Sequence, residues 1–550
     1  MTPARLRGLF GGVLGAAGMI AVLTLLSRAV GFVRWLVQSW TLGASSTATA
    51  YATANTVPNV LFEVAAGGAL AGAVVPLLAV PLAKHLRGDV DRIASAVLGW
   101  TLLVLVPLAA AVAALAGPIA GVLAPDADPA QHDLTTTLLR VFALQIPLYG
   151  IGVVLSGVLQ AQKRFFWPAA APLLSSGVVI GSYLAFGRLA GGQGADPAAL
   201  TDAAVAWLAW GTTAGVAAMS LPQLVPVLRS GVRLRPALRF PPAVARRAGR
   251  LALAGIGALL AQQASVVVVL RLANDHGVAG TINIFQYSQA VYYLPYAVLA
   301  VPLSTAVFPR LAARAGAGDR TGFAAMAAGS TRAVVGAALV GFALLVAVAP
   351  AATAVFSLRQ EMPGMTAAIT ALAPGIVGYA LIFHLSRALY AVDRGRAAVA
   401  ATATGWVSVV LASWAGVELL AADGDDGPGT LVSLSAGSSA GMILAGVLLV
   451  LAVRRAGGPP AVAGLGRTVV VAGAGAAAGA VLGRLAVDAL LGALGAGLPA
   501  AVVAAVAGAA VAAGTTALAV VALDRGTWRV GSWARDDAAQ EPPRGPTIPA

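Results

Sequence analysis

The chain has 550 residues and a formal net charge of +14, with 59% hydrophobic and only 10% charged residues. Its mean hydropathy of +0.87 is too high for a soluble globule, which needs polar side chains to cover its surface. Cysteine is absent, so disulfides, thiolate chemistry and cysteine-ligated metals are excluded.

Apolar stretches long enough to cross a bilayer follow one another along the chain. We expect about fourteen transmembrane helices, near residues 11–42, 50–82, 94–123, 135–161, 167–187, 200–228, 251–274, 281–309, 333–357, 366–391, 397–419, 431–453, 468–487 and 498–523. The sequence therefore predicts an all-α polytopic membrane protein.

The first apolar stretch contains two arginines, Arg28 and Arg34. A cation in hydrocarbon costs about 3 kcal/mol or more, so such residues face a hydrated cavity or an anionic partner. Snorkelling to the membrane rim is the alternative, chiefly for Arg34, which lies nearer the helix end. The basic start, with Arg5 and Arg7, resembles a signal peptide, but the apolar run continues past any cleavage point, which predicts an uncleaved first span.

The loops between the apolar stretches alternate in charge. The basic ones hold Lys84, Arg87 and Arg92, then Lys163 and Arg164, seven arginines in 229–250, then Arg310, Arg314 and Arg320, Arg394 and Arg396, and Arg454 and Arg455. The acidic ones hold Asp126, Asp128 and Asp133, then Asp196 and Asp202, Glu361, and Asp423, Asp425 and Asp426. By the positive-inside rule we expect both termini and the basic loops to be cytoplasmic, so we interpret the arginines as a topology signal and not as evidence of a nucleic-acid partner.

An internal repeat organises the helices. Residues 156–164 (SGVLQAQKR) match 386–394 (SRALYAVDR) at a shift of 230 positions, and the proline-containing segment 57–79 has an echo at 294–312. We expect two six-helix lobes, 1–228 and 251–455, related by a pseudo-twofold axis along the membrane normal. A basic cytoplasmic linker (229–250), two extra helices (456–523) and a disordered cytoplasmic tail (524–550) complete the predicted organisation.

Other motifs favour structural roles. The glycine-rich run 473–479 (GAGAAAG) follows no strand, so close helix packing explains it better than nucleotide binding. Arg484 and Asp488 are spaced for a local ion pair. The four histidines show no ligand-like spacing, so we expect neither a metal site nor a hydrolytic triad, and no enzyme.

Several short motifs carry a family resemblance: 27–34 (SRAVGFVR), 42–44 (LGA), 57–61 (VPNVL), 68–69 (GA), 75–76 (VP), 164–165 (RF) and 308–309 (FP). In order and spacing the chain resembles the MurJ/MviN lipid II flippases of the MOP exporter superfamily. The resemblance implies a multi-pass protein of the bacterial cytoplasmic membrane that moves an undecaprenyl-pyrophosphate-linked disaccharide-pentapeptide to the outer leaflet for peptidoglycan synthesis. Cell-wall synthesis proteins are further expected partners.

The chain departs from the family pattern at several positions. An acid that follows the second arginine in the family is Trp35 here, and the acid before the Gly-Ala pair is Gly67. The family's arginine in the second helix falls at Phe62, and its Asp-Arg pair in the eighth helix falls at Gln289 and Ala290. Two expected cations are therefore missing, which indicates a divergent member.

The expected substrate site consists of Arg28 and Arg34 with Asn59, and Arg271 as a compensating cation. Glu63 and His384 are the candidates for ion coupling. We expect no cofactor, because a coupling cation or the membrane potential can drive the cycle. Two alternatives stay open: another MOP-type exporter of lipid-linked polysaccharide, and a non-transporting membrane scaffold for cell-wall synthesis.

Overall fold

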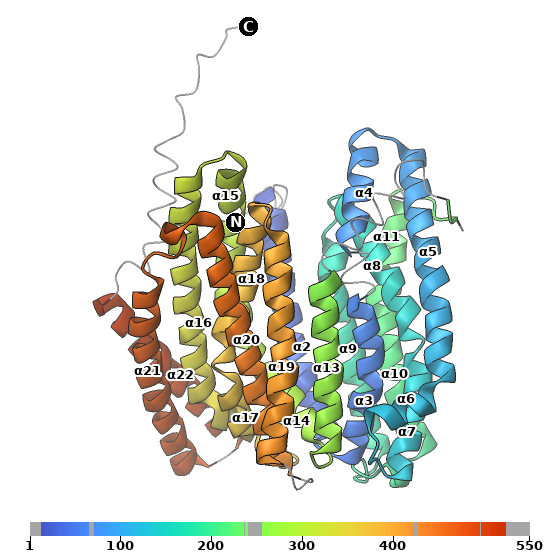
Figure 1. The fold of residues 1–550 in the computed structure, drawn as a ribbon. Helices are drawn as coiled ribbons and strands as arrows, with labels where there is room; N and C mark the ends of the chain where they lie inside the picture. Colours follow the sequence, from blue (N-terminus) through green and yellow to red (C-terminus); the bar gives the residue numbers. More distant parts are fainter. Residues whose placement is uncertain are drawn as a thin grey trace, which may run out of the picture. The chain divides into compact units, whose positions relative to one another are not determined.

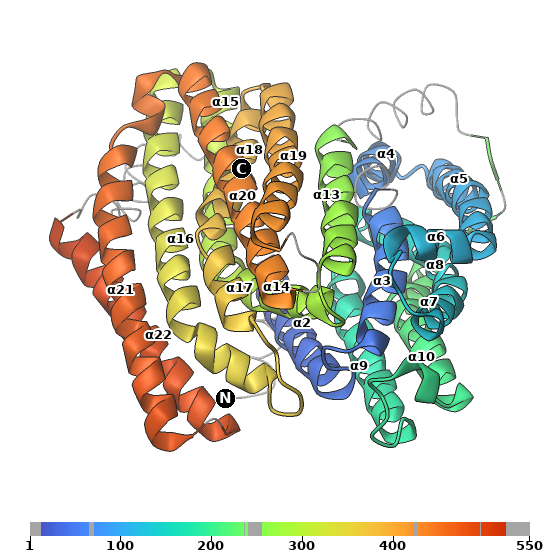
Figure 2. The ribbon, with the colours of Figure 1, turned by 60° about the horizontal axis from the view of Figure 1, so that its bottom comes forward.

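The computed structural model describes residues 13–64, 71–235, 237–239, 256–421, 426–495 and 497–523. Over these residues it consists of helices joined by turns, without a β-strand. The chain forms two compact units (Figures 1 and 2). Unit 1 comprises 1–290, 356–364 and 414–434, and unit 2 comprises 291–355, 365–413 and 435–550. The tail 524–550 and most of the predicted linker lie outside the described residues.

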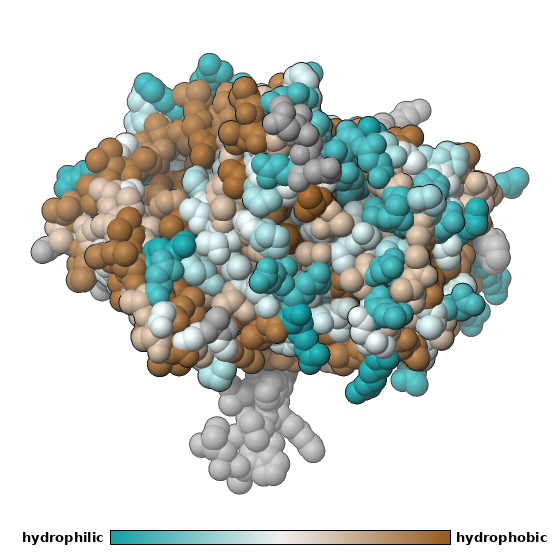
Figure 3. All heavy atoms as spheres, turned by 90° about the horizontal axis from the view of Figure 1, so that it is seen from below, coloured by the Kyte–Doolittle hydropathy of each residue, from teal (hydrophilic) through white to brown (hydrophobic). Residues whose placement is uncertain are grey.

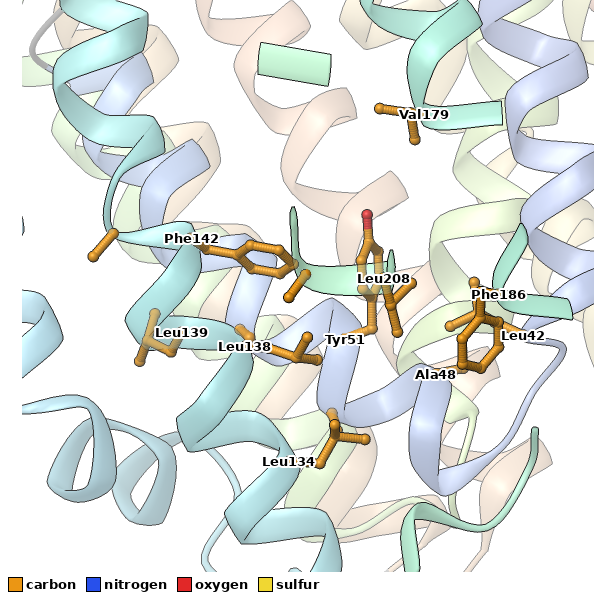
Figure 4. Close-up of a cluster of buried hydrophobic side chains, with 14 of the residues drawn as sticks. Leu42, Ala48, Tyr51, Leu134, Leu138, Leu139, Phe142, Val179, Phe186 and Leu208 are labelled. Carbon is orange, nitrogen blue, oxygen red and sulfur yellow. The ribbon is translucent and has the colours of Figure 1, made fainter. Parts of the chain in front are cut away.

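Unit 1 contains the helices of the first half of the chain. These are α2 (Val13–Thr41), α3 (Ser46–Phe62), α4 (Ala71–Ala83), α5 (Arg87–Ala114), α6 (Ala116–Leu123), α7 (Pro129–Phe142), α8 (Gln145–Ala161), α9 (Phe166–Leu189), α10 (Asp202–Ser220), α11 (Leu224–Arg229), α13 (Ile256–Asp275) and most of α14 (Thr281–Pro295). Tyr51, Phe142 and Phe186 pack in a core between α3, α7 and α9 (Figure 4). This core fixes α3 and therefore the polar residues at its two ends.

Unit 2 contains the later helices. They are η4 (Tyr296–Ala300), α15 (Val301–Gly316), α16 (Arg320–Phe356), α17 (Met365–Leu372), α18 (Gly375–Ala391), α19 (Gly395–Leu420), α20 (Gly427–Gly457), α21 (Leu465–Leu494) and α22 (Leu498–Leu523), with the ends of α19 and α20 in unit 1. Gly475 and Gly479 allow α21 to contact α22 closely, as predicted for a small-residue stripe. The predicted pair of Arg484 with Asp488 forms at 2.8 Å.

Each predicted apolar stretch contains a helix. In the described part of the chain eleven helices are long and apolar enough to cross a membrane, or twelve if the bent pair α17 and α18 counts as one span. The predicted count of fourteen is not confirmed, because 65–70 and the side chains at the start of α2 lie outside the description. Brown hydrophobic residues are prominent at the edge of the end face in Figure 3, as expected for helices whose sides meet lipid.

The internal repeat has a structural counterpart. Arg164 and Arg394 each donate their backbone N–H to a leucine carbonyl five residues earlier, both at 2.8 Å. The residues before them, Lys163 and Asp393, both have positive φ (61° and 57°). In the second echo, a π-helical turn follows the proline-containing helix in each copy, at 63–64 and in η4. The two copies thus share backbone geometry as well as sequence.

The compact units do not follow the predicted lobe boundaries. α13 and the first part of α14 belong to unit 1, together with 356–364 and 414–434. The predicted lobes, 1–228 and 251–455, therefore stay a prediction from the repeat. Unit 1 thus contains α13 and the first part of α14 together with α2, the helix that carries Arg28 and Arg34.

Candidate functional site

The two arginines of α2 occupy different environments. Arg28 is exposed, whereas Arg34 is half-buried and its Nε atom is buried without a hydrogen-bond partner. Six helical positions separate them, which places them about 9 Å apart along the axis and about 120° apart around it. Within the described residues neither arginine forms an ion pair. Arg34 therefore presents a positive charge that nothing in the described protein neutralises.

A buried polar network links α3 and α9 to Gln38 of α2, the helix that carries Arg34. The hydroxyls of Tyr51 and Tyr183 lie 2.9 Å apart, and Tyr183 donates to Oε1 of Gln38 at 3.2 Å. These partners satisfy one another, and no hydrogen bond among the described residues joins them to the guanidinium of Arg34.

Asn59 and Glu63 lie one turn apart on the same face of α3. The hydroxyl of Tyr149 donates to Oδ1 of Asn59 at 3.1 Å. Because its oxygen accepts this bond, the amide of Asn59 keeps both N–H donors for another acceptor. Glu63 is exposed.

Aromatic rings occupy two positions where charged residues were expected. Phe62 stacks on Tyr149 with ring centroids 4.4 Å apart. Trp35 packs edge-on against Tyr287 at 6.1 Å, and Tyr287 continues to Phe356 at 5.5 Å. The missing charges have been replaced by packing, not by other charges.

A second polar cluster joins the turn between α2 and α3 to distant parts of unit 1; we call it the clasp. The side-chain amide of Gln360 accepts from the N–H of Ala44 and donates to its carbonyl oxygen, both at 3.1 Å. The hydroxyl of Tyr287 donates to the carbonyl of Gly43 at 2.9 Å, and Nδ2 of Asn283 donates to the carbonyl of Ala48 at 3.1 Å. Gly43 has φ of +67°, which exposes its carbonyl in the turn.

Arg271 on α13 contacts α6 and an acid of its own helix. Its Nη1 donates to the carbonyl of Val122 at 2.6 Å, and its Nη2 lies 3.4 Å from Asp275. Asn274 on the same helix bonds Thr53 and the carbonyl of Leu123, each at 3.0 Å. No described contact connects Arg271 with Arg28 or Arg34, so its compensating role stays a prediction.

His384 lies inside unit 2. Its side chain is buried, and Nε2 lies 3.0 Å from the hydroxyl of Ser330 on α16. This contact links α18 to α16, which supports a role in helix packing. Its neighbour Arg387 stacks on Phe383 at 3.8 Å and bonds Thr305 at 3.3 Å. The described residues contain no group of three metal-ligating side chains.

Sequence reasoning found the arginines but missed their surroundings. Tyr51 and Tyr183 are single polar residues in apolar stretches, as Arg34 is, and their signal is a hydroxyl that must find a partner in a membrane interior. Gln360 lies instead in the polar loop between Arg359 and Glu361, where a glutamine carries no such signal. Its partner could not be predicted, since Gln360 lies 316 positions from Ala44.

Comparisons with known proteins place these features in a family. The model described as "Lipid II flippase MurJ" matches residues 39–490. The curated "Probable lipid II flippase MurJ" of Synechocystis sp. is 31% identical over 41% of this chain and 41% of its own length. Its namesake in Rhizobium tropici is 31% identical over 52% and 53%. The chain thus spans about half the length of the curated relatives it matches.

Solved structures show the same fold. A structure of "Lipid II flippase MurJ, inward closed conformation" matches with a TM-score of 0.70 and 16% identity, over 92% of this chain and 99% of its own. An inward-facing multidrug resistance MATE family transporter of the MOP superfamily matches with a TM-score of 0.63 and 16% identity, over 79% and 94%. At these identities the likeness concerns the fold.

Proposed function

The chain belongs to the lipid II flippase MurJ family, and we propose that it carries an undecaprenyl-pyrophosphate-linked peptidoglycan precursor across the membrane. It is a multi-pass membrane protein, as the sequence predicted. The proposed cargo is lipid II or a related lipid-linked glycan, moved from the cytoplasmic to the outer leaflet by alternating access. The proposed location is the bacterial cytoplasmic membrane, with both termini cytoplasmic.

One observation carries the proposal: the half-buried guanidinium of Arg34 has no counter-ion among the described residues. A buried charge without a partner is costly, so it is retained where an anionic ligand completes it. Pyrophosphate is an anion with several acceptor oxygens, and a guanidinium binds such groups through paired, charge-assisted hydrogen bonds. The free N–H donors of Asn59 add neutral contacts to the same ligand.

The transport step follows from the chemistry of the cargo. A pyrophosphate cannot enter hydrocarbon unless its charge is compensated, whereas the apolar polyprenyl chain dissolves in the lipid interior. In the proposed cycle Arg34 on α2 binds the head group while the tail remains in the bilayer. The membrane field supplies about 2.3 kcal/mol per elementary charge per 100 mV, which can reset the carrier without a nucleotide. No cofactor is proposed.

Glu63 is the proposed coupling residue. It lies one turn from Asn59, whose side-chain oxygen accepts from Tyr149. Protonation of Glu63 would therefore change the net charge beside the proposed head-group contact of Asn59 without moving the helix. His384 is the weaker candidate, because Ser330 already occupies its Nε2 atom.

Transport is tested by reconstituting the full chain in proteoliposomes with fluorescent lipid II and measuring its movement between leaflets. The proposal expects transport above that of protein-free liposomes and its loss in Arg34→Ala. A non-transporting scaffold is the second candidate, favoured by the aromatic replacement at Phe62. The scaffold would bind partners but give no transport in either variant, and that result would overturn the flippase proposal.

The proposed topology is tested with single cysteines, since the chain has none of its own. Arg229 and Asp126 are both exposed and belong to loops of opposite charge. In intact cells an impermeant thiol reagent should label Asp126→Cys and leave Arg229→Cys unlabelled. The reverse labelling pattern would contradict the assigned sides.

A further inference from the structure

The segment that follows α11 lies extended along α5, beyond the part of the chain used by the proposed cargo site (Figure 2). We call residues 231–239 the strap; Pro236 within it lies outside the described residues. The N–H of Arg233 donates to Asp91 at 3.0 Å, and the N–H of Arg235 donates to Ser95 at 3.0 Å. Trp100 donates from Nε1 to the carbonyl of Leu238 at 2.8 Å.

The sequence of α5 is adapted to this contact. Asp91, Ser95 and Gly99 recur every four residues and therefore share one helix face. A Cβ atom at Gly99 would overlap the carbonyl oxygen of Ala237, so glycine is required for the strap to lie this close.

A groove of about 790 Å³ runs between the strap and α5. Its lining is mostly apolar and includes Leu98, Leu102 and Leu103 of α5 and Leu238 of the strap. Arg235 and Arg239 lie at the same groove. The groove therefore combines an apolar floor with two cations on a backbone that α5 holds in place.

These cations are available for a ligand. In the described part of the chain no acid pairs with Arg235 or Arg239, and the nearby Asp89 pairs with Arg92. Trp100 is partly exposed and satisfies its N–H on the strap, a placement typical of tryptophan at the level of lipid head groups. An arginine pair without a described counter-ion, beside leucines in one groove, complements a phosphate joined to a hydrocarbon chain.

We propose that the groove between α5 and the strap binds one anionic glycerophospholipid, with its phosphate on Arg235 and Arg239 and an acyl chain along Leu98, Leu102 and Leu103. All lining residues come from α5 and the strap, so Arg28, Arg34 and Asn59 of the proposed cargo site are not part of this groove. The bound lipid would fix the strap to α5 at the membrane surface. The proposal does not depend on the transport function.

Native mass spectrometry of the full chain in detergent tests the site, with phosphatidylglycerol and phosphatidylcholine of identical acyl chains as probes. We expect retained phosphatidylglycerol and a loss of about fivefold to tenfold in its affinity in the double variant Arg235→Gln/Arg239→Gln, because two charge-assisted contacts are removed. The control Arg454→Gln/Arg455→Gln removes two exposed arginines elsewhere and should bind as the unmodified chain does. Leu102→Trp, which fills the groove, should weaken binding while both charges remain.

Three results would overturn the proposal. Equal binding of the two lipids would show that charge is not recognised, and an equal loss in the control would show that only net charge matters. Displacement of phosphatidylglycerol by undecaprenyl pyrophosphate, blocked by Leu102→Trp, would assign the groove to the cargo tail instead. The thermal unfolding temperature of each variant serves as the control. If it is unchanged, a loss of lipid binding is not caused by a folding defect.

Discussion

The Arg34 site on α2 and α3 and the clasp at the turn between these helices differ in how their polar groups are paired. In the clasp, neutral amides and a hydroxyl pair with backbone groups of Gly43, Ala44 and Ala48. Around Arg34, the neutral groups pair with each other and the cation is left over. The first arrangement closes a contact within the protein, and the second is complete only with an anion.

The two arrangements also differ in energy. A neutral hydrogen bond contributes about 1 kcal/mol, and an unmatched neutral group, such as Oδ1 of Asn283, costs about 1–3 kcal/mol. An unmatched charge in an apolar unit costs more free energy than an unmatched neutral group. Such charges are therefore retained mainly at functional sites. The clasp also joins the α2–α3 turn to α14 and to 356–364. Variants in each region should therefore give different signatures.

The largest effect is expected for Arg34→Ala. Loss of a partly buried charge-assisted contact of about 2–3 kcal/mol should weaken lipid II binding about 30-fold to 150-fold. Titration of lipid II by native mass spectrometry measures it, with Arg455→Ala as a control of equal charge change. Thermal stability should not fall, since the variant also removes an unpaired cation. Full affinity in a folded Arg34→Ala protein would show that the arginine is structural.

The next effect is a gain. The double change Phe62→Arg with Ala290→Arg restores cations at the two positions where the family resemblance expects them. Two added ion pairs of about 0.5–1 kcal/mol each should strengthen lipid II binding about fivefold to 30-fold. Phe62→Leu with Ala290→Leu serves as a control that disturbs the stacking on Tyr149 without adding charge. Equal binding by the unmodified chain and the arginine variant would show that these positions do not set cargo affinity.

The sequence predicted the family, the helical class and the arginines, because each leaves a local signal. A cation inside an apolar run is visible without knowledge of its neighbours, and so is the repeat that gives Arg164 and Arg394 the same backbone geometry. The clasp is different, because Gln360 has meaning only beside Ala44. The sequence predicts the strap only as part of a linker for the same reason: the spacing of Asp91, Ser95 and Gly99 on α5 is visible in the sequence, but the segment that contacts them is not.

The clasp should show a smaller effect than the charged site. Gln360→Ala removes two neutral hydrogen bonds to Ala44, a loss of about 1–2 kcal/mol of local stability. Amide hydrogen exchange in residues 42–48 should accelerate about fivefold or more, while lipid II affinity changes little. Gln193→Ala, at an exposed glutamine, is the matched control. Unchanged exchange in the Gln360 variant would mean that the clasp does not hold the turn.

The smallest effect is expected for Arg28→Ala. Arg28 is exposed and points about 120° away from Arg34 around α2, so water screens its contact with a ligand. Its removal should cost about 0.5–1 kcal/mol, a twofold to fivefold loss of lipid II affinity, and the loss should shrink as salt is raised. The loss caused by Arg34→Ala should persist at high salt, because that guanidinium is partly buried. If Arg28→Ala instead weakened binding as strongly as Arg34→Ala, and did so independently of salt, both arginines would have to contact the head group directly. The helix would then have to rotate or bend on binding, and the comparison of a charged site with a neutral clasp would need to include a movement of α2.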